Sequence, residues 1–140
     1  MPSPGAVGTA MWLFSTINGD RPLINDQLGL GPVRGLSQAD IGMEVVKSGL
    51  RTEITFGRVT AVGGIASINY GSLNRVIREV VTIDPRSYFE EVSAPGDSGS
   101  WWLDPTTSEA IGLHFAGSDS PERGLAIDMS SVLFALDVIL

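Results

Sequence analysis

Short apolar and β-branched runs, separated by turn-forming residues, recur along most of the chain. We predict strands over residues 7–14, 43–47, 53–62, 65–70, 76–83, 100–103, 110–116 and 124–127. The turn signals between them are Asn18-Gly19-Asp20, Ser48-Gly49, Gly63-Gly64, Tyr70-Gly71-Ser72 and Asp104-Pro105. Many short strands at this spacing indicate an antiparallel barrel or sandwich rather than alternating strands and helices.

The two ends of the chain depart from this strand pattern. From Ser130 onward the apolar positions return at helical spacing, with Val132, Leu133, Leu136 and Leu140 on one face. Ser130 or Ser131 is a suitable N-cap for this helix. Residues 15–42 are rich in Gly, Pro, Asn and Asp without a regular period, which predicts a loop. With 140 residues, the chain forms one domain at most.

Composition excludes several classes of function. The formal net charge of −7 argues against a nucleic-acid-binding surface, which requires a basic face. With no cysteine and one histidine, we expect neither disulfides nor a metal site, and no cofactor. No apolar run approaches the ~20 residues of a membrane helix. Since 43% of residues are hydrophobic and only 18% charged, we expect a partner or another segment to cover part of the surface.

The segment Gly96-Asp97-Ser98-Gly99-Ser100 is the strongest candidate for chemistry. A serine between glycines, after an aspartate, is typical of a nucleophile held in a tight turn. In such a turn the backbone N–H groups of Gly96 and Ser98 can stabilise a developing oxyanion. The alternative is an ordinary polar turn between strands, since Gly, Asp and Ser dominate turns in general.

A serine nucleophile needs a base, and the sequence offers one histidine only. His114 lies in the apolar, strand-like run Ile111-Gly112-Leu113-His114-Phe115. It is either a pocket residue or a core histidine whose ring is satisfied by a backbone carbonyl. The chain therefore carries half of a serine-based active site.

Two blocks, residues 94–100 (APGDSGS) and 110–118 (AIGLHFAGS), followed by a strand and a C-terminal helix, resemble the second half of a chymotrypsin-like serine peptidase. Residues 45–49 (VVKSG) and 55–62 (TFGRVTAV) are similar to the bacterial branch of that family. The resemblance covers residues 40–140 and implies an all-β fold, a six-stranded antiparallel β-barrel with a C-terminal helix. The family's first barrel, which carries the catalytic His and Asp, is not recognisable in residues 1–40.

The resemblance also implies roles for individual residues. Ser98 becomes the nucleophile, the N–H groups of Gly96 and Ser98 become the oxyanion hole, and Asp97 becomes the buried carboxylate that holds the turn. His114 is expected to contact a Glu or Gln side chain before the scissile bond, because an imidazole N–H can donate to either. The expected substrate-binding residues are Pro95, His114, Phe115, Ala116 and Gly117.

These observations predict a serine endopeptidase of which this chain is the nucleophile-bearing half. Residues 1–40 would form an irregular N-terminal arm, and residues 41–140 the second barrel with its helix. The expected partners are a peptide or protein substrate, a first-barrel segment or second polypeptide that supplies His and Asp, and a further copy of this chain. The alternative is a non-catalytic barrel that serves as a binding or assembly module.

Overall fold

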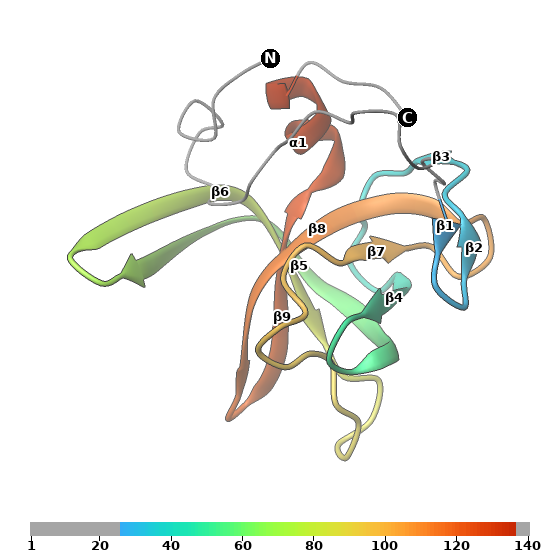
Figure 1. Ribbon diagram of the computed structural model, residues 1–140, viewed down its shortest axis with the longest axis horizontal. Coiled ribbons are helices and arrows are strands. Elements are labelled where there is room, and N and C mark those ends of the chain that lie inside the picture. The colour runs from blue at the N-terminus through green and yellow to red at the C-terminus, as the bar shows by residue number, and fades with distance from the viewer. Residues whose placement is uncertain (1–25, 137–140) are drawn as a thin grey trace, which may run out of the picture.

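The computed structural model describes residues 26–136 as a β-barrel with one helix (Figure 1). The predicted strand 7–14, the turn at Asn18-Gly19-Asp20 and Leu140 lie outside the described residues. The elements, in chain order, are β1 (Asp26–Gln27), β2 (Gly31–Pro32), β3 (Gly35–Leu36), β4 (Glu44–Gly49), β5 (Glu53–Tyr70), β6 (Leu73–Asp84), β7 (Trp101–Leu103), β8 (Glu109–Asp119), β9 (Glu122–Asp128) and α1 (Met129–Leu136).

Six antiparallel strands close into a ring, which confirms the predicted barrel. The strand order is β8-β7-β4-β5-β6-β9, and β9 pairs back with β8 to complete the circle. Each strand of the ring has a neighbour on both sides, so the closed barrel has no edge strand. The short β3 joins the outside of this ring by pairing parallel with β8.

The glycine pair Gly63-Gly64 does not form the predicted turn. Residues 53–62 and 65–70 belong to one continuous strand, β5, which is 18 residues long. Gly63 has φ of +64°, and the β5–β6 register shifts around it, so the glycines form a bulge inside the strand rather than its end. The β5–β6 hairpin extends beyond the barrel as an arm, with its turn at residues 71–72 (Figure 1).

The predicted loop 15–42 contains regular structure in its described part. β1 and β2 form a two-stranded antiparallel pair at the side of the barrel, and β3 follows them directly (Figure 1). All three strands are two residues long, too short to produce a visible hydrophobic period.

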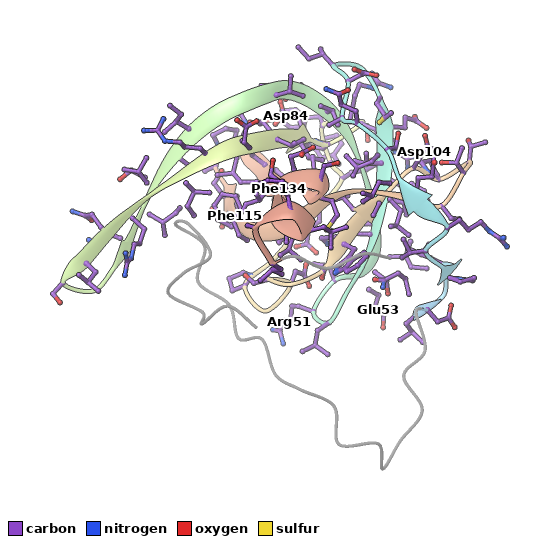
Figure 2. The ribbon with its side chains drawn as sticks, turned by 90° about the horizontal axis from the view of Figure 1, so that it is seen from above. Arg51, Glu53, Asp84, Asp104, Phe115 and Phe134 are labelled. Atoms are coloured by element: carbon purple, nitrogen blue, oxygen red, sulfur yellow. The ribbon has the colours of Figure 1, made fainter. Side chains whose placement is uncertain are left out.

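Two clusters of buried side chains fill the structure. One, with Val46, Ile77, Leu103 and Leu113 among its members, lies against α1. The second lies around Trp102 and Ile83. The helix buries Val132, Leu133 and Leu136, as its apolar spacing predicts, while Phe134 is 88% exposed on its outer face (Figure 2).

The start of α1 differs from the expected serine cap. The carboxylate of Asp128 accepts hydrogen bonds from the N–H and the hydroxyl of Ser131, at 3.1 and 3.2 Å. Asp128 is therefore the N-cap, and the helix begins one residue earlier than Ser130. Within residues 26–136, no helix combines the length and apolar character needed to cross a membrane.

Candidate active site

The turn that carries Ser98 connects the loop after β6 to strand β7. Gly96 and Gly99 have φ of +104° and +93°, a backbone conformation that favours glycine, which explains the two glycines that flank the serine. Two hydrogen bonds tie the turn to β8: Gly99 N–H donates to the carbonyl of His114, and His114 N–H donates to the carbonyl of Ser100. Ser98 itself is exposed, and its hydroxyl lies 3.3 Å from the carbonyl oxygen of Phe115.

Asp97 fixes this turn from inside the barrel. Its side chain is fully buried, and one carboxylate oxygen accepts from the N–H groups of Arg51 and Thr52 at 2.8 and 3.1 Å. The other oxygen accepts from the Thr52 hydroxyl at 2.6 Å and from the N–H of Ala94 at 3.1 Å. The β4–β5 turn, where Figure 2 labels Arg51, is thereby joined to the nucleophile turn across 46 positions of sequence.

Lys47 on β4 completes the buried polar centre. Its ammonium lies 3.1 Å from Asp97 Oδ2 and donates to the hydroxyls of Thr52 and Thr55 at 2.9 and 2.8 Å. These three contacts match the three N–H donors of an ammonium group. Thr55 in turn donates to the carbonyl of Val92, in the segment that leads to the nucleophile turn. We name Lys47, Thr52, Thr55 and Asp97 the anchor cluster.

The anchor cluster is held in its charged form. Burial alone would raise the pKa of Asp97, but hydrogen bonds from Thr52, Arg51, Ala94 and Lys47 hold that pKa well below its usual range. Burial lowers the pKa of Lys47, and the hydrogen bond and charge of Asp97 oppose this shift. Each charge therefore makes the other tolerable in the interior.

Close packing around the anchor cluster explains Gly49, the last residue of β4. A Cβ at this position would lie 2.5 Å from Asp97 Oδ1, closer than atoms in van der Waals contact can approach. The Lys-Ser-Gly sequence at residues 47–49 thus supplies both the buried cation and the space that its partner carboxylate needs.

Two backbone N–H groups beside Ser98 have no partner within residues 26–136. Asp97 N–H donates to the carbonyl of Ala94, and Ser100 N–H donates to that of Asp97. Gly96 N–H and Ser98 N–H, in contrast, make no hydrogen bond to the described part of the chain. Both residues are exposed at the surface of the barrel.

A pocket of about 230 Å³ opens next to Ser98. One wall comes from the segment before the nucleophile, with Ser93, Ala94 and Pro95. The other comes from β8, with His114, Ala116 and Gly117, and continues at Ser118 and Asp119. Four of the five predicted substrate-binding residues line this pocket; the fifth, Phe115, contributes its backbone carbonyl to Ser98 instead.

His114 is 3% exposed and forms no hydrogen bond with Ser98. Its Nδ1 accepts a hydrogen bond of 3.2 Å from the indole Nε1–H of Trp102, not from a backbone group, so its ring is not satisfied by a carbonyl. Burial, with a smaller contribution from the charge of Lys47, lowers the pKa of His114 to about 4. The imidazole is therefore neutral at pH 7.

Neither the histidine nor the lysine of the chain is placed to act as a base for Ser98. The only histidine of the sequence is bonded to Trp102, and the only lysine is used by the anchor cluster. Residues 26–136 also contain no group of three or more His, Asp or Glu side chains placed to hold a metal ion.

Sequence reasoning missed Lys47, Thr52, Thr55 and Trp102. The pairing of Lys47 with Asp97 spans 50 positions, and the pairing of Trp102 with His114 depends on the β7–β8 register. A signal for the first was present: Lys47 is the only lysine of the chain and stands in an apolar strand, where a cation requires a buried partner.

Comparison with solved structures supports the resemblance to chymotrypsin-like serine peptidases that the sequence motifs indicated. Cellulomonas bogoriensis chymotrypsin matches with a TM-score of 0.69 and 22% identity, over 88% of this chain and 64% of that one. A glutamic acid specific serine protease, described as using a novel histidine triad in substrate binding, matches with a TM-score of 0.64 and 26% identity, over 89% and 63%. Nocardiopsis protease matches with a TM-score of 0.62 and 22% identity, over 78% and 53%.

This chain therefore has the chymotrypsin-like fold and is similar to bacterial chymotrypsin-like serine proteases. It spans between 53% and 64% of the length of these three proteins. No family model matches the sequence. No curated protein matches it either.

Proposed function

We propose that this chain is the nucleophile- and pocket-bearing barrel of a serine endopeptidase. The observation that carries the proposal is the position of Ser98: exposed at the mouth of a pocket, on a turn held by a buried carboxylate, with two unpaired N–H groups beside it. An ordinary polar turn requires neither the pocket nor the buried ion pair beneath it. The fold shared with bacterial serine proteases supports the same conclusion.

In the proposed reaction, Ser98 Oγ attacks the carbonyl carbon of the scissile bond and transfers its proton to an imidazole base. The carbonyl oxygen becomes an oxyanion that accepts from the N–H groups of Gly96 and Ser98. The C–N bond then breaks, the amine leaves with the proton from the imidazolium, and water hydrolyses the acyl-enzyme. The side chain before the scissile bond, Glu or Gln, occupies the pocket lined by His114.

The base must come from outside the barrel. His114 is buried against Trp102, so the imidazole and its orienting carboxylate would be supplied by a first-barrel segment or a second polypeptide. In this proposal residues 1–40 form an arm and residues 41–140 the second barrel. A second copy of the chain is a further possible partner, and a peptide or protein is the substrate.

One observation favours a second candidate function. Because the only histidine is committed to the pocket, a barrel that binds peptide segments without cleaving them would account for the same site. The two candidates differ in whether Ser98 becomes reactive when a base is supplied.

Fluorophosphonate labelling, read by intact mass, distinguishes the two. In labelling, an Oγ–P bond forms, fluoride leaves and a base takes the hydroxyl proton. We expect no rapid labelling of the purified chain, and stoichiometric labelling of Ser98 once a His- and Asp-bearing first barrel or excess imidazole is added. Ser98→Ala should abolish the adduct, and Ser72→Ala, at the exposed hairpin turn, should retain it.

Rapid labelling without any addition would show that a base is already present in the chain. Failure to label under every condition, combined with retained peptide binding, would favour the binding module over the peptidase.

A further inference from the structure

The Trp102–His114 pair fixes which ring nitrogen of the histidine carries the proton. Trp102 is fully buried on β7, and its residue partner across the sheet is Gly112, which makes His114 its diagonal neighbour on the same face of β8. An indole N–H can only donate, so Nδ1 of His114 must keep its lone pair to accept the bond. The neutral imidazole then carries its proton on Nε2.

The Nε2–H donor is available to the pocket. Within residues 26–136, Arg75 Nε is the only sealed side-chain nitrogen or oxygen without a hydrogen-bond partner. Nε2 of His114 also has no hydrogen-bond partner in this part of the chain. Because it is not among the solvent-inaccessible atoms without a partner, it is accessible to solvent. Since His114 lines the pocket beside Ser98, that access leads into the pocket.

The charges around the pocket disfavour an anionic ligand. Asp119 contributes to the wall, and Glu122 on β9 accepts from the N–H groups of Val92 and Ser93 directly behind it. Lys47 lies 5.2 Å from the Trp102 ring on the inner side and is neutralised by Asp97. Arg123, the strand partner of the wall residue Ser118, is paired with Asp84 at 2.7 Å. Arg51 lies at the nucleophile turn, its Cβ 3.6 Å from where a Cβ on Gly96 would be, and is not part of the pocket lining. No lysine or arginine lines the pocket.

Protonation of His114 would not supply the positive charge that the pocket lacks. An imidazolium has N–H groups on both nitrogens, so its Nδ1–H would face the indole N–H of Trp102 with no acceptor between them. Burial of the ring opposes the charged form as well, and lowers the pKa of His114 to about 4.

We propose that the pocket selects glutamine over glutamate, and that Trp102 is the positioning residue that holds His114 as a neutral Nε2–H donor. The inference rests on the proposed function in that it concerns the side chain before the scissile bond. A glutamine amide offers a carbonyl oxygen to Nε2–H and an NH₂ group to the Ser93 hydroxyl or the Asp119 carboxylate. A glutamate would bring a second negative charge into a pocket without a cation, at the cost of its desolvation.

The similar glutamic acid specific protease is described as using a histidine triad in substrate binding. This chain has one histidine and cannot supply three. Its His114 is backed by an uncharged tryptophan that only donates, which is the chemistry expected where the ligand is neutral.

The single histidine makes the tautomer directly measurable. In a chain labelled with ¹⁵N-histidine, long-range ¹H–¹⁵N spectra contain one imidazole, and we expect the Nε2–H tautomer from pH 7.5 to pH 5. Trp102→Phe removes the donor and keeps an aromatic ring, so His114 should titrate at a higher pH. Trp101→Phe, the neighbouring and partly exposed tryptophan, is the matched control and should not change the titration.

Binding of three product-type peptides tests the selectivity. They share one acetylated sequence and end in Gln, Glu or Leu, and binding is followed at the His114 resonances. At pH 7 we expect the Gln peptide to bind at least about tenfold more tightly than the other two. In Trp102→Phe at pH 5.5 the gap between Gln and Glu should narrow.

Equal or tighter binding of the Glu peptide, an Nδ1–H tautomer, or binding of no peptide would overturn the inference. Equal binding of the Leu and Gln peptides would also overturn the inference, because the peptide side chain would then form no selective hydrogen bond with His114. None of these outcomes bears on whether Ser98 reacts with fluorophosphonate, so failure of this inference is separable from failure of the proposed peptidase. If Trp102→Phe does not fold, the tautomer and peptide measurements on the unmodified chain still decide the question.

Discussion

Two buried polar centres lie near the Ser98 turn and its pocket, and the barrel stabilises them in different ways. The anchor cluster is ionic: Lys47 and Asp97 are both fully buried, and the carboxylate accepts five hydrogen bonds. The Trp102–His114 pair is neutral and has a single side-chain hydrogen bond, with burial excluding charge. The first centre fixes a backbone turn, and the second presents one N–H donor to a pocket.

The difference shows which kind of interior polar group suits which task. A nucleophile turn contains glycines with positive φ and would be flexible by itself, so several strong hydrogen bonds to one carboxylate are needed to fix it. A pocket donor needs a fixed orientation and no charge, which one indole N–H provides. The two centres are nevertheless coupled, because the cation of Lys47 contributes to the low pKa of His114.

The largest effect on stability is expected when the negative charge of Asp97 is removed. Asp97→Asn keeps the volume but leaves the Lys47 ammonium buried without a counter-charge. We expect the free energy of unfolding, measured by urea titration, to fall by about 3–5 kcal/mol. The double variant Lys47→Met/Asp97→Asn should recover part of this loss because it removes the uncompensated charge. A loss below about 1 kcal/mol in the single variant would show that the pair is not needed to fix the turn.

As the pH is lowered, protonation of His114 should destabilise the fold at a higher pH than protonation of Asp97 does. The folded chain keeps His114 unprotonated down to pH of about 4, whereas the unfolded chain binds that proton near 6.5. Stability from this group is therefore present above pH 6.5 and is lost as pH falls toward 4, by about 3 kcal/mol. Asp97, with its lowered pKa, contributes stability above its unfolded pKa that is lost only at more acidic pH.

The pH dependence is measured by urea unfolding at a series of pH values from 7 to 4. The control, His114→Gln, lacks the titrating group and should show a shallower decline between pH 6.5 and 4.5. Parallel curves for the two proteins would mean that His114 titrates alike in the folded and unfolded chains, contrary to its burial against Trp102.

A smaller effect is expected from the neutral edge of the anchor cluster. Thr55 accepts from Lys47 at 2.8 Å and donates to the carbonyl of Val92 at 2.8 Å, both in the interior. Thr55→Val removes both hydrogen bonds at nearly constant volume, and we expect a loss of about 1–3 kcal/mol. Thr106→Val, in the exposed β7–β8 turn, is the control and should stay within about 0.5 kcal/mol of the parent. A similar loss at both positions would contradict the assigned role of Thr55.

The contrast between the two centres also explains how much the sequence could predict. Strand positions and the helix face follow from local apolar periodicity, and the nucleophile turn follows from a five-residue pattern of glycine, aspartate and serine. The barrel and the turn that exposes Ser98 were within reach of such local signals. The placement of His114 at a pocket was predicted from the resemblance to chymotrypsin-like serine peptidases, because the residues alone also allowed a core histidine. Gly63-Gly64 misled because glycines that form a bulge and glycines that form a turn are alike in sequence.

Both buried pairs were out of reach for a common physical reason. Lys47, the partner of Asp97, lies 50 positions away in the sequence. The hydrogen bond between Trp102 and His114 forms only when β8 pairs in the observed register with β7 and β9. Side-chain pairing across a barrel is determined by the ring as a whole, and no local period encodes it. A lone lysine in an apolar strand indicates that a partner exists without indicating which one.

The smallest effect on stability is expected for an ion pair at the surface. Arg86 and Glu90 form a two-bond ion pair at 3.0 and 3.2 Å, similar in length to the Lys47–Asp97 contact of 3.1 Å, but both side chains are in contact with solvent. Water screens such a pair and competes for its hydrogen bonds, so distance alone does not determine its contribution. Glu90→Gln should leave the melting temperature unchanged within error, at low and at high salt. A clear, salt-dependent drop would show that the loop before the nucleophile depends on this pair, and that burial is not what separates the anchor cluster from other ion pairs of the chain.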